Sequence, residues 1–242
     1  MLKLRDAIAA SAAVLAIAGA VALGNWQTQR AAAKIVLERA WIDAERKQPI
    51  VVDSPSAIAV EHLPQRVRMR GSFAHGKTVW LDNRMLDGVP GFYVVTPLIL
   101  DRGPGAVIVN RGWAARDPAE RTRLPAVGYP QGNIEIEGLA LRELPRLLEL
   151  GDRTLDHGLP AIWHNFDVDA MRPLIAAPLA DFVVQQTSSI DDGLLRRWIR
   201  PAFGVERHRG YAFQWYALAV LIGAIGALLV VRGQIRSHSR TP

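Results

Sequence analysis

The chain has 242 residues, a formal net charge of +6 and a composition that is 50% apolar. Because it contains no cysteine, disulfide scaffolds, thiolate metal sites and cysteine nucleophiles are excluded. The apolar content is ample for a folded core, which argues against intrinsic disorder, and the length corresponds to one domain with additions.

Two stretches that lack Lys, Arg, Asp and Glu lie near the ends of the chain, at residues 7–29 and 210–231. About 20 mainly apolar residues are enough for a helix to cross a bilayer. In the second stretch the run LAVLIGAIGALLVV has no polar residue, and aromatic residues precede it as in a membrane-interface belt. We therefore predict this organisation: a tail at 1–6, a transmembrane helix at 7–29, one domain at 30–209, a transmembrane helix at 210–231 and a basic tail at 232–242.

The first stretch has a second interpretation. Its basic start, its apolar run and the triplet Ala20-Val21-Ala22 are also typical of a cleavable signal peptide. The apolar run is longer than a usual signal core, and Trp26 can act as an interfacial anchor, so we favour a retained span. Either interpretation carries the domain between the two stretches across the membrane.

The basic excess is concentrated in the two tails. Residues 30–209 hold 24 basic and 22 acidic side chains, which leaves only +2 in the whole domain. A nearly balanced domain without a known nucleic-acid motif argues against nucleic acid as a partner. The counts of Lys and Arg beside the two spans do not decide their orientation.

Small residues recur every fourth position in both predicted spans, a pattern that allows helix backbones to approach closely in lipid. The positions are Ala12, Ala16, Ala20 and Gly24 in the first span, and Ala219, Gly223 and Ala227 in the second. We consider a seam between the two spans as a hypothesis. The alternative is that Ala and Gly are simply frequent in such helices.

The domain between the spans begins with a predicted helix at 31–47, which continues the first span and ends before Pro49. After it the apolar period changes to two, as in RVRMRGSF. Strands are predicted at 66–73, 78–81, 92–100, 106–110, 134–139 and 182–186. The predicted fold class is a membrane protein of α+β type: two transmembrane helices that flank one mostly antiparallel β domain, a sheet or a barrel, with minor helices.

Local signals add detail to the domain. Turns are predicted at 88–91 and 103–105, and a short helix at 167–176 with Asp167 as its cap. A hairpin around the second turn would place Arg111 and Trp113 on one face, if the strand continued unbroken. An Arg beside aromatic side chains could recognise a carboxylate or a partner protein, but we favour a role in stabilising the sheet.

Catalytic and metal-binding motifs are absent from the sequence. It has no GxSxG, HExxH or GxxxxGK[ST] pattern, and its histidines form no pair with metal-ligand spacing. An enzyme would need a cluster of histidines that the fold brings together from His62, His75, His157 and His164. A metal site at His164 with Asp167 and Asp169 is disfavoured, since such a turn more often begins a helix.

His208 differs from the other histidines because it stands two residues before the second uncharged stretch. On a helix, Tyr211 and Trp215 follow it at i+3 and i+7 and share its face. Its imidazole could ligate haem iron, with the aromatic rings as packing walls and with Arg207 and Arg209 as propionate partners. The alternative is that His, Arg, Tyr and Trp are common anchors at interfacial helix ends.

Six segments, in this order, resemble the Surfeit locus protein 1 (Shy1-like) family. They are RVRMRGSFAHGKTVWLDNR (66–84), PGFYVVTPL (90–98), VNRGWAARD (109–117), IEGLA (136–140), AIWHNFDVDAM (161–171) and RHRGYAFQWYALA (207–219). The flanking spans match as well, so the resemblance covers nearly the whole chain. It implies an assembly factor for cytochrome c oxidase rather than an enzyme.

The resemblance also implies a location and a cofactor. The protein is expected in a bacterial cell inner membrane, with both termini cytoplasmic and the central domain periplasmic. Some bacterial members are understood to bind haem a and to assist its insertion into oxidase subunit I, so that subunit is the expected partner and haem a synthase a second candidate. The family pattern His-x-x-Tyr-Ala-x-x-Trp corresponds to His208, Tyr211, Ala212 and Trp215.

Two hypotheses remain open for the role in assembly. In the first, the protein holds or passes haem a, with His208 as a weak axial ligand to the iron. In the second, it is a scaffold without a cofactor that binds an oxidase subunit during assembly. No metal other than haem iron is expected.

Overall fold

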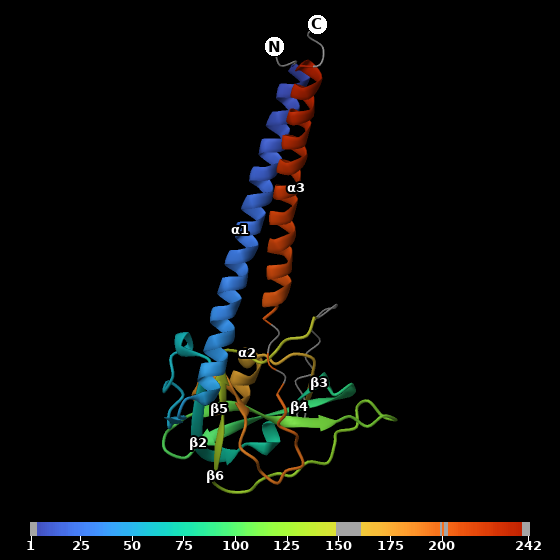
Figure 1. The fold of residues 1–242 in the computed structure, drawn as a ribbon. Helices are drawn as coiled ribbons and strands as arrows, with labels where there is room; N and C mark the ends of the chain where they lie inside the picture. Colours follow the sequence, from blue (N-terminus) through green and yellow to red (C-terminus); the bar gives the residue numbers. More distant parts are fainter. Residues whose placement is uncertain (1–3, 149–160, 199, 201–202, 239–242) are drawn as a thin grey trace. The chain divides into compact units, whose positions relative to one another are not determined.

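The structure, a computed structural model, describes residues 4–148, 161–198, 200 and 203–238 (Figure 1). The chain divides into two compact units. One unit comprises Met1–Ala40 and Pro201–Pro242, and the other comprises Trp41–Arg200. The first is a pair of long helices and the second is a sheet domain.

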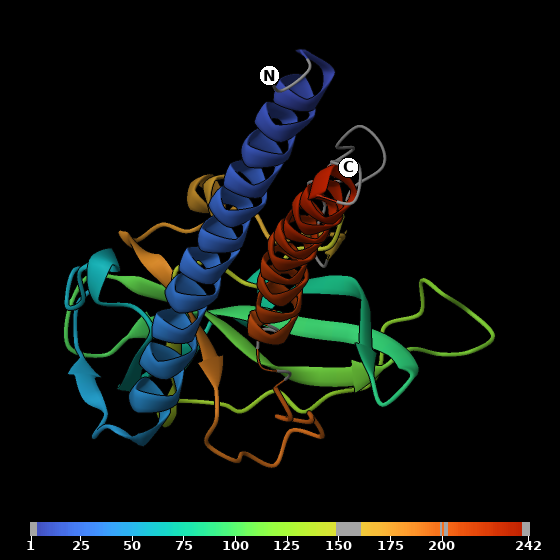
Figure 2. The same cartoon turned by 45° about the horizontal axis from the view of Figure 1, so that its top comes forward.

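The helical unit is formed by α1 (Leu4–Arg46), as far as Ala40, and by α3 (Val205–His238). The two helices run side by side (Figures 1 and 2). Ala7–Arg46 and Val205–Arg232 reach mean hydropathies of 2.2 and 2.1, long and apolar enough to cross a membrane. Only 11% and 6% of these apolar windows is buried, unlike the core helix of a soluble domain. The two predicted spans are thus helices, and α1 continues unbroken through the predicted helix at 31–47.

Residues in contact along the two helices follow a seven-residue repeat. Buried and half-buried positions alternate in steps of three and four: Ala13, Ile17, Ala20, Gly24 and Gln27 on α1, and His208, Ala212, Trp215, Ala219, Ile222 and Gly226 on α3. This spacing is that of a left-handed coiled coil.

The predicted rows of small residues are therefore only partly correct. Ala20, Gly24 and Ala219 are buried and Gly223 is half-buried, but Ala12 and Ala16 are exposed, as is Ala227. The reason is geometric: a strict four-residue row drifts around a helix of 3.6 residues per turn, whereas alternating steps of three and four stay on one face.

The helices approach closely at Gly24. A Cβ atom there would lie 2.6 Å from Cε1 of Tyr216. The Tyr216 ring cannot move freely, because its hydroxyl donates to Oδ1 of Asn25 at 2.8 Å and lies 3.3 Å from Oγ1 of Thr28. A side chain at Gly24 would have to displace this ring and break its hydrogen bonds.

We expect Gly24→Leu to separate the helices and Gly19→Leu to leave them paired, because a Cβ at Gly19 would meet nothing within 4 Å. The chain has no cysteine, so a pair introduced at Ile17 and Gly223 can report the distance. In native membranes, Gly24→Leu should slow disulfide formation between these cysteines at least about tenfold, a loss of about 1.4 kcal/mol. Equal rates of disulfide formation in Gly24→Leu and Gly19→Leu would contradict close packing of the helices at Gly24.

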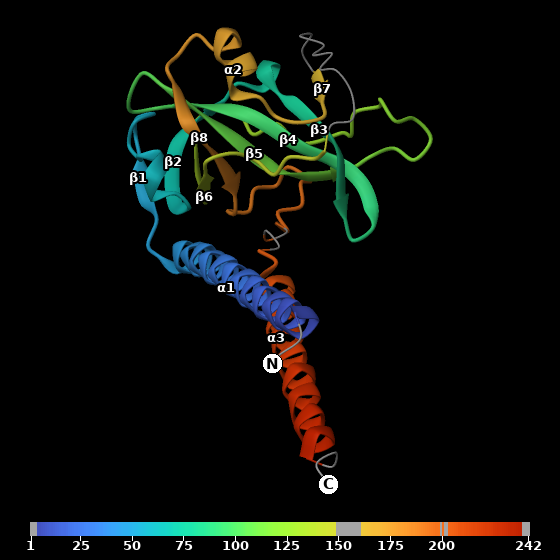
Figure 3. The ribbon, with the colours of Figure 1, turned by 90° about the horizontal axis from the view of Figure 1, so that it is seen from above.

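The sheet domain contains eight strands among its described residues, which form one sheet in the order β1-β2-β6-β8-β5-β4-β3-β7 (Figure 3). Their bounds are β1 (Ile50–Val52), β2 (Gln65–Phe73), β3 (Val79–Leu86), β4 (Val89–Leu100), β5 (Ala106–Ala115), β6 (Ile134–Leu141), β7 (Ala161–Trp163) and β8 (Leu179–Gln186). Five pairings are antiparallel, and those of β1 with β2, β3 with β7 and β5 with β8 are parallel. The predicted α+β class and its mostly antiparallel sheet are confirmed.

Five of these strands close into a ring. β2 pairs with both β6 and β4, so the ring runs β2-β6-β8-β5-β4 and returns to β2. Its interior is an apolar cluster to which all five strands contribute, including Met69, Leu98, Val109, Ile136 and Phe182. The strands therefore form a small filled barrel.

The closure occurs at Gly71 of β2. A Cβ atom there would lie 2.0 Å from the carbonyl oxygen of Ile99 on β4, so only glycine permits the two backbones to approach this closely. Gly71 pairs with Ile134 of β6 and with Leu100 of β4, which makes it the residue at which β2 passes from one neighbour to the other.

Alternation along β2 separates its two faces. Val67 and Met69 point into the barrel and are fully buried, while the arginines between them point outward. Arg68 and Arg66 both donate to the Glu137 carboxylate, Arg66 at 2.8 Å. The hydrogen bonds from these two arginines hold the pKa of Glu137 below its usual value.

A second cluster covers part of the outside of the barrel. It joins outward residues of the strands, such as Ile108, Leu139 and Val183, to Ala44 near the end of α1 and to Met171 of α2 (Val168–Met171). The Asp167 side chain caps α2 by accepting from the amides of Asp169 and Ala170, as predicted. A short 3₁₀ turn that contains Pro173 follows, so the predicted helix is shorter than 167–176.

The strand predictions are confirmed in their positions but not in all their ends. β3 and β5 run beyond residues 81 and 110, and the three-residue strands β1 and β7 were not predicted. Both extended strands contain register shifts, which interrupt the alternation on which the predictions rely. The predicted turn at 88–91 is wrong, because Val89 already begins β4. The turn is the pair Asp87-Gly88, both at positive φ, as a two-residue hairpin requires.

Arg111 and Trp113 do not lie on an unbroken strand. The register of β5 against β4 shifts between Asn110 and Gly112, which leaves Arg111 as the extra residue of a bulge. The Arg111 guanidinium lies 5.0 Å from the ring centroid of Phe73, whereas Trp113 donates to the carbonyl of Arg84. The two side chains thus have separate surroundings.

A buried ion pair fixes this bulge. Arg111 donates to Oδ2 of Asp192 at 2.9 Å, and both side chains are 0% exposed. Arg196 donates to the same oxygen at 2.7 Å. Burial lowers the pKa of Arg111 and the bond to Asp192 opposes this shift, so the guanidinium remains charged. Arg111 is therefore a structural residue and is not available to an external carboxylate.

We expect Asp192→Asn to destabilise the domain by about 3–5 kcal/mol, because two arginines would lose their counter-ion in a buried site. Asp87→Asn is the matched control: it also removes an aspartate that pairs with an arginine, Arg197, but both side chains are more than 60% exposed. Its cost should be below about 1 kcal/mol. Denaturant unfolding of both variants measures the difference, and similar costs would show that the buried pair does not stabilise the fold.

Candidate functional site

The predicted site residues all lie in the first three turns of α3. The helix begins at Val205, after Gly204 in the left-handed region, and the amide of His208 donates to the carbonyl of Gly204. His208, Ala212 and Trp215 follow the seam with α1, because they are separated by four and three residues. His208 therefore faces the inside of the helix pair, whereas its sequence neighbours Arg207 and Arg209 are exposed.

His208 is half-buried and its imidazole contacts α1. Nδ1 lies 2.7 Å from Oε1 of Gln27. An amide oxygen can only accept, so the proton of this hydrogen bond belongs to Nδ1 of the imidazole. In a neutral imidazole with this proton the lone pair is on Nε2, and no described residue is a partner of that nitrogen. A histidine can ligate a metal through either ring nitrogen, and here Nε2 is the available one.

The other predicted site residues differ in whether they lie in the seam or on the outside of α3. Trp215 is half-buried in the seam, but Tyr211 is 47% exposed on the outside of the helix. Arg207 is exposed, and Arg209 pairs with Glu206 at 3.0 Å, where both side chains are exposed. Neither arginine contacts His208, although both retain enough freedom to reach an acidic group near it.

Sequence reasoning missed the polar residues on α1. Gln27 binds His208, and Asn25 accepts from the Tyr216 hydroxyl, while Thr28 donates to the carbonyl of Gly24 on its own helix. These residues belong to the run Asn25-Trp26-Gln27-Thr28-Gln29, in which only Trp26 was interpreted, as an anchor. The available signal was the position of polar side chains inside an uncharged span, where each needs a partner.

Three other histidines are dispersed over the described part of the sheet domain, and His238 is at the end of α3. His75 lies 2.8 Å from the Pro130 carbonyl through Nε2, and His164 lies 3.4 Å from the Leu148 carbonyl through its own Nε2. His62 belongs to a short 3₁₀ turn, and His157 lies outside the described residues. Within residues 4–148, 161–198, 200 and 203–238, no three His, Cys, Asp or Glu side chains gather as metal ligands.

Comparison with known proteins covers nearly the whole chain. The model of the SURF1 family matches residues 14–220. A SURF1-like protein of Dictyostelium discoideum is 27% identical over 188 residues, which cover 64% of this chain and 68% of that protein. Surfeit locus protein 1 of Xenopus tropicalis is 25% identical over 215 residues, 81% of this chain and 67% of the relative. The human Surfeit locus protein 1 is 25% identical over 236 residues, 88% of this chain and 75% of the relative. The chain belongs to the SURF1 family.

Proposed function

We propose that this protein is an assembly factor of cytochrome c oxidase that assists delivery of haem a to subunit I. Membership of the SURF1 family supports a role in assembly rather than in catalysis. The observation that carries the haem proposal is the hydrogen bond between Nδ1 of His208 and Gln27, since it leaves Nε2 able to ligate iron.

A single histidine ligand, His208, suits haem that is bound only transiently. The His208 imidazole would hold the haem iron through Nε2, and the haem would supply the cargo that the oxidase needs. Gln27 holds that imidazole in one tautomer and one orientation, which is the usual task of a group behind a metal-binding histidine. A single protein ligand also suits transfer, because the carrier must release what it binds.

Trp215 offers an aromatic wall in the same seam as His208. Arg207 and Arg209 are the proposed partners of the haem propionates, by charge-assisted hydrogen bonds. Arg207 is exposed, and the Arg209 pair with Glu206 is between exposed side chains, which contribute little when they pair. Exchanging Glu206 for a propionate would therefore cost little. Tyr211 is proposed as an outer wall.

The proposed location is a bacterial inner membrane. Two helices that each cross the bilayer place both ends of the chain on one side, which we assign to the cytoplasm, and place the sheet domain in the periplasm. The proposed partners are subunit I of the oxidase, haem a synthase as a second candidate, and the bilayer.

A second candidate function is a scaffold that binds an oxidase subunit without a cofactor. The same hydrogen bond favours it in one respect, because a bond between Gln27 and His208 also ties α1 to α3. In this case His208 is a structural residue of the helix pair.

We expect membranes from a deletion strain to lose the haem a band in a reduced-minus-oxidised spectrum and to keep the b- and c-type bands. Complementation with wild type or with His164→Ala should restore the band, since His164 lies in the sheet domain. Complementation with His208→Ala should restore about 10% or less of the haem a band, because loss of the ligand should weaken haem binding at least about tenfold. An unchanged band in the deletion strain would contradict a role in oxidase assembly.

Purified protein separates the carrier from the scaffold. We expect haem a to give an absorbance shift with the wild-type chain and none with His208→Ala, and Gln27→Leu to weaken haem a binding about 10–100-fold through loss of the orienting bond. Gln29→Leu is the matched control, because Gln29 is exposed. Without haem, ¹⁵N NMR of histidine-labelled protein should show the Nδ1–H form of His208 in wild type and a mixture in Gln27→Leu. No haem-dependent shift in the wild type, together with intact complementation by His208→Ala, would favour the scaffold.

A further inference from the structure

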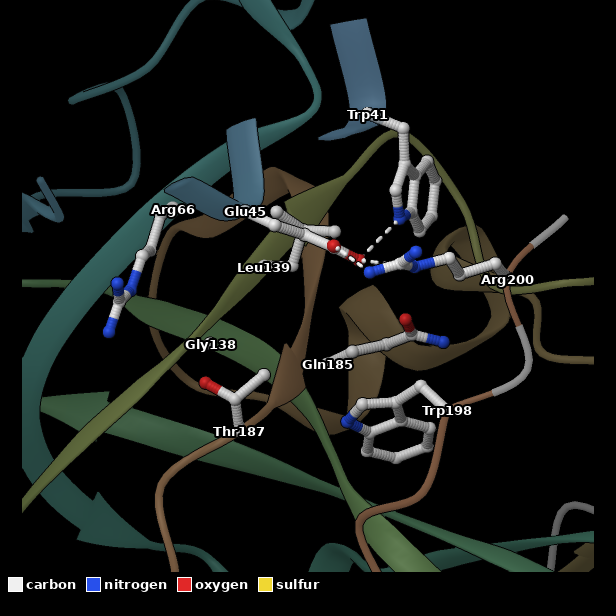
Figure 4. Close-up of a pocket in the computed structure, with 9 residues that line it drawn as sticks. All are labelled: Trp41, Glu45, Arg66, Gly138, Leu139, Gln185, Thr187, Trp198 and Arg200. Atoms are coloured by element: carbon white, nitrogen blue, oxygen red, sulfur yellow. Dashed lines mark hydrogen bonds and ion pairs between the residues drawn. The ribbon is translucent and has the colours of Figure 1, made fainter. Parts of the chain in front are cut away.

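A cleft of about 320 Å³ lies on the outer face of the barrel, within the unit Trp41–Arg200 (Figure 4). Leu139 and Gln185 of neighbouring strands form part of its floor, and Figure 4 shows the Gln185 side chain extending between Trp41 and Trp198. Its volume is at the lower end of the range for small-molecule sites, about 300–1,000 Å³. It has room for one side chain and the amide groups beside it.

The floor of the cleft contains an amide that faces the cleft and has no partner among the described residues. Gln185 is 3% exposed, and among the described residues nothing forms a hydrogen bond with its side chain. Asn110 is its direct neighbour across β5 and β8 and is 0% exposed, and both of its amide atoms are also without a partner. Leaving buried donors and acceptors unpaired costs free energy, so the Asn110 amide, next to Gln185, needs an explanation.

The hydrogen-bonded pairing of β5 with β8 ends at these two amides. β5 and β8 are parallel neighbours, and their pairing ends at Asn110 and Gln185. Beyond this point β5 approaches Leu195, while Gln186 pairs with Gly138 of β6. The two amides therefore lie where the parallel pairing of β5 and β8 ends, with Asn110 in the middle of β5 and Gln185 near the carboxyl end of β8.

The walls of the cleft contain two tryptophans, and each arginine in them is paired with a glutamate. Trp198 donates to the carbonyl of Gln186, and Trp41 donates to the Glu45 carboxylate, so both indoles are held in place. Arg200 is neutralised by Glu45 at 2.6 Å, and Arg66 by Glu137 at 2.8 Å. A charged ligand would have to displace one of these pairs, whereas a neutral polar ligand would not.

We propose that this cleft binds a segment of a partner polypeptide in extended form, through a backbone amide at Gln185 and an apolar side chain between Trp41 and Trp198. A peptide group presents one donor and one acceptor, which complement the donor and acceptor of the Gln185 amide. The site is separate from His208 and does not depend on haem binding. Its occupant is a neutral peptide segment rather than a carboxylate or a cofactor.

The test uses the full-length chain in lipid nanodiscs, labelled with 5-fluorotryptophan. Trp41→Phe and Trp198→Phe assign the two resonances of the cleft among the 7 tryptophans of the chain. The probe is N-acetylleucine methylamide, a neutral capped residue of about 13 non-hydrogen atoms, for which a dissociation constant of about 1 mM is expected. It should shift the resonances of Trp41 and Trp198 in a saturable manner.

Gln185→Met removes the amide and keeps a long unbranched side chain. The variant should fold with unchanged or higher Tm, because it eliminates an unpaired buried group, and should weaken probe binding at least about tenfold. Gln131→Met is the matched control on an exposed loop and should bind as wild type does.

Three results would overturn the proposal. N-acetylleucine, which replaces the terminal amide with a carboxylate, could bind as tightly as the amide or more tightly, and the cleft would then be a carboxylate site. If neither probe gave a saturable shift, the Gln185 and Asn110 amides would be satisfied by water alone. Equal binding by wild type and Gln185→Met would likewise exclude the assigned contact.

Discussion

The sheet domain depends on the close approach of two backbones at Gly71. Because this residue has no Cβ, β2 can pair with β6 along most of its length and then with β4 at its end. That transfer converts an open sheet into a ring with a filled interior. The ring in turn fixes which face of each strand is outside. Gln185 lies on an outer face because it alternates with Val184, which packs inside.

The helical unit depends on a different constraint. In lipid, polar side chains must find hydrogen-bond partners within the protein, so polar residues near one end of the seam pair with one another. Gln27 meets His208, and Asn25 accepts from Tyr216. The small residues elsewhere in the seam bring the helices close enough for these bonds. One arrangement therefore accounts for both the packing of the helices and the tautomer of His208.

Much of this fold could be predicted from local patterns. The two uncharged stretches, the alternation in β2 and the cap at Asp167 act over a few residues, and each predicted its element correctly. The errors arose where a distant contact decides the outcome. The bulge at Arg111 exists because Asp192, 81 residues away in sequence, binds its guanidinium. The seam follows steps of three and four because the second helix selects one face.

The candidate site was predictable to the same extent. The position of His208 before the second span identified it as a candidate, and the family pattern strengthened that choice. Its partner Gln27 is 181 residues away, so no local pattern could show the pair. Gln185 and Asn110 carry no signal at all in the sequence, since an amide in a strand becomes informative only when its surroundings are known.

The unpaired polar atoms of the described residues are not equivalent, and the difference favours the cleft as a binding site. Arg84, Arg111 and Arg196 each have buried nitrogens without a partner, but each also donates through another nitrogen of the same guanidinium. Their unused nitrogens are a consequence of a five-donor group that no protein environment satisfies completely. Asn110 has neither its donor nor its acceptor satisfied, and Gln185 beside it lines an open cleft. The unpaired Asn110 amide beside accessible volume at Gln185 supports the proposed binding site, whereas a partly used guanidinium indicates a structural ion pair.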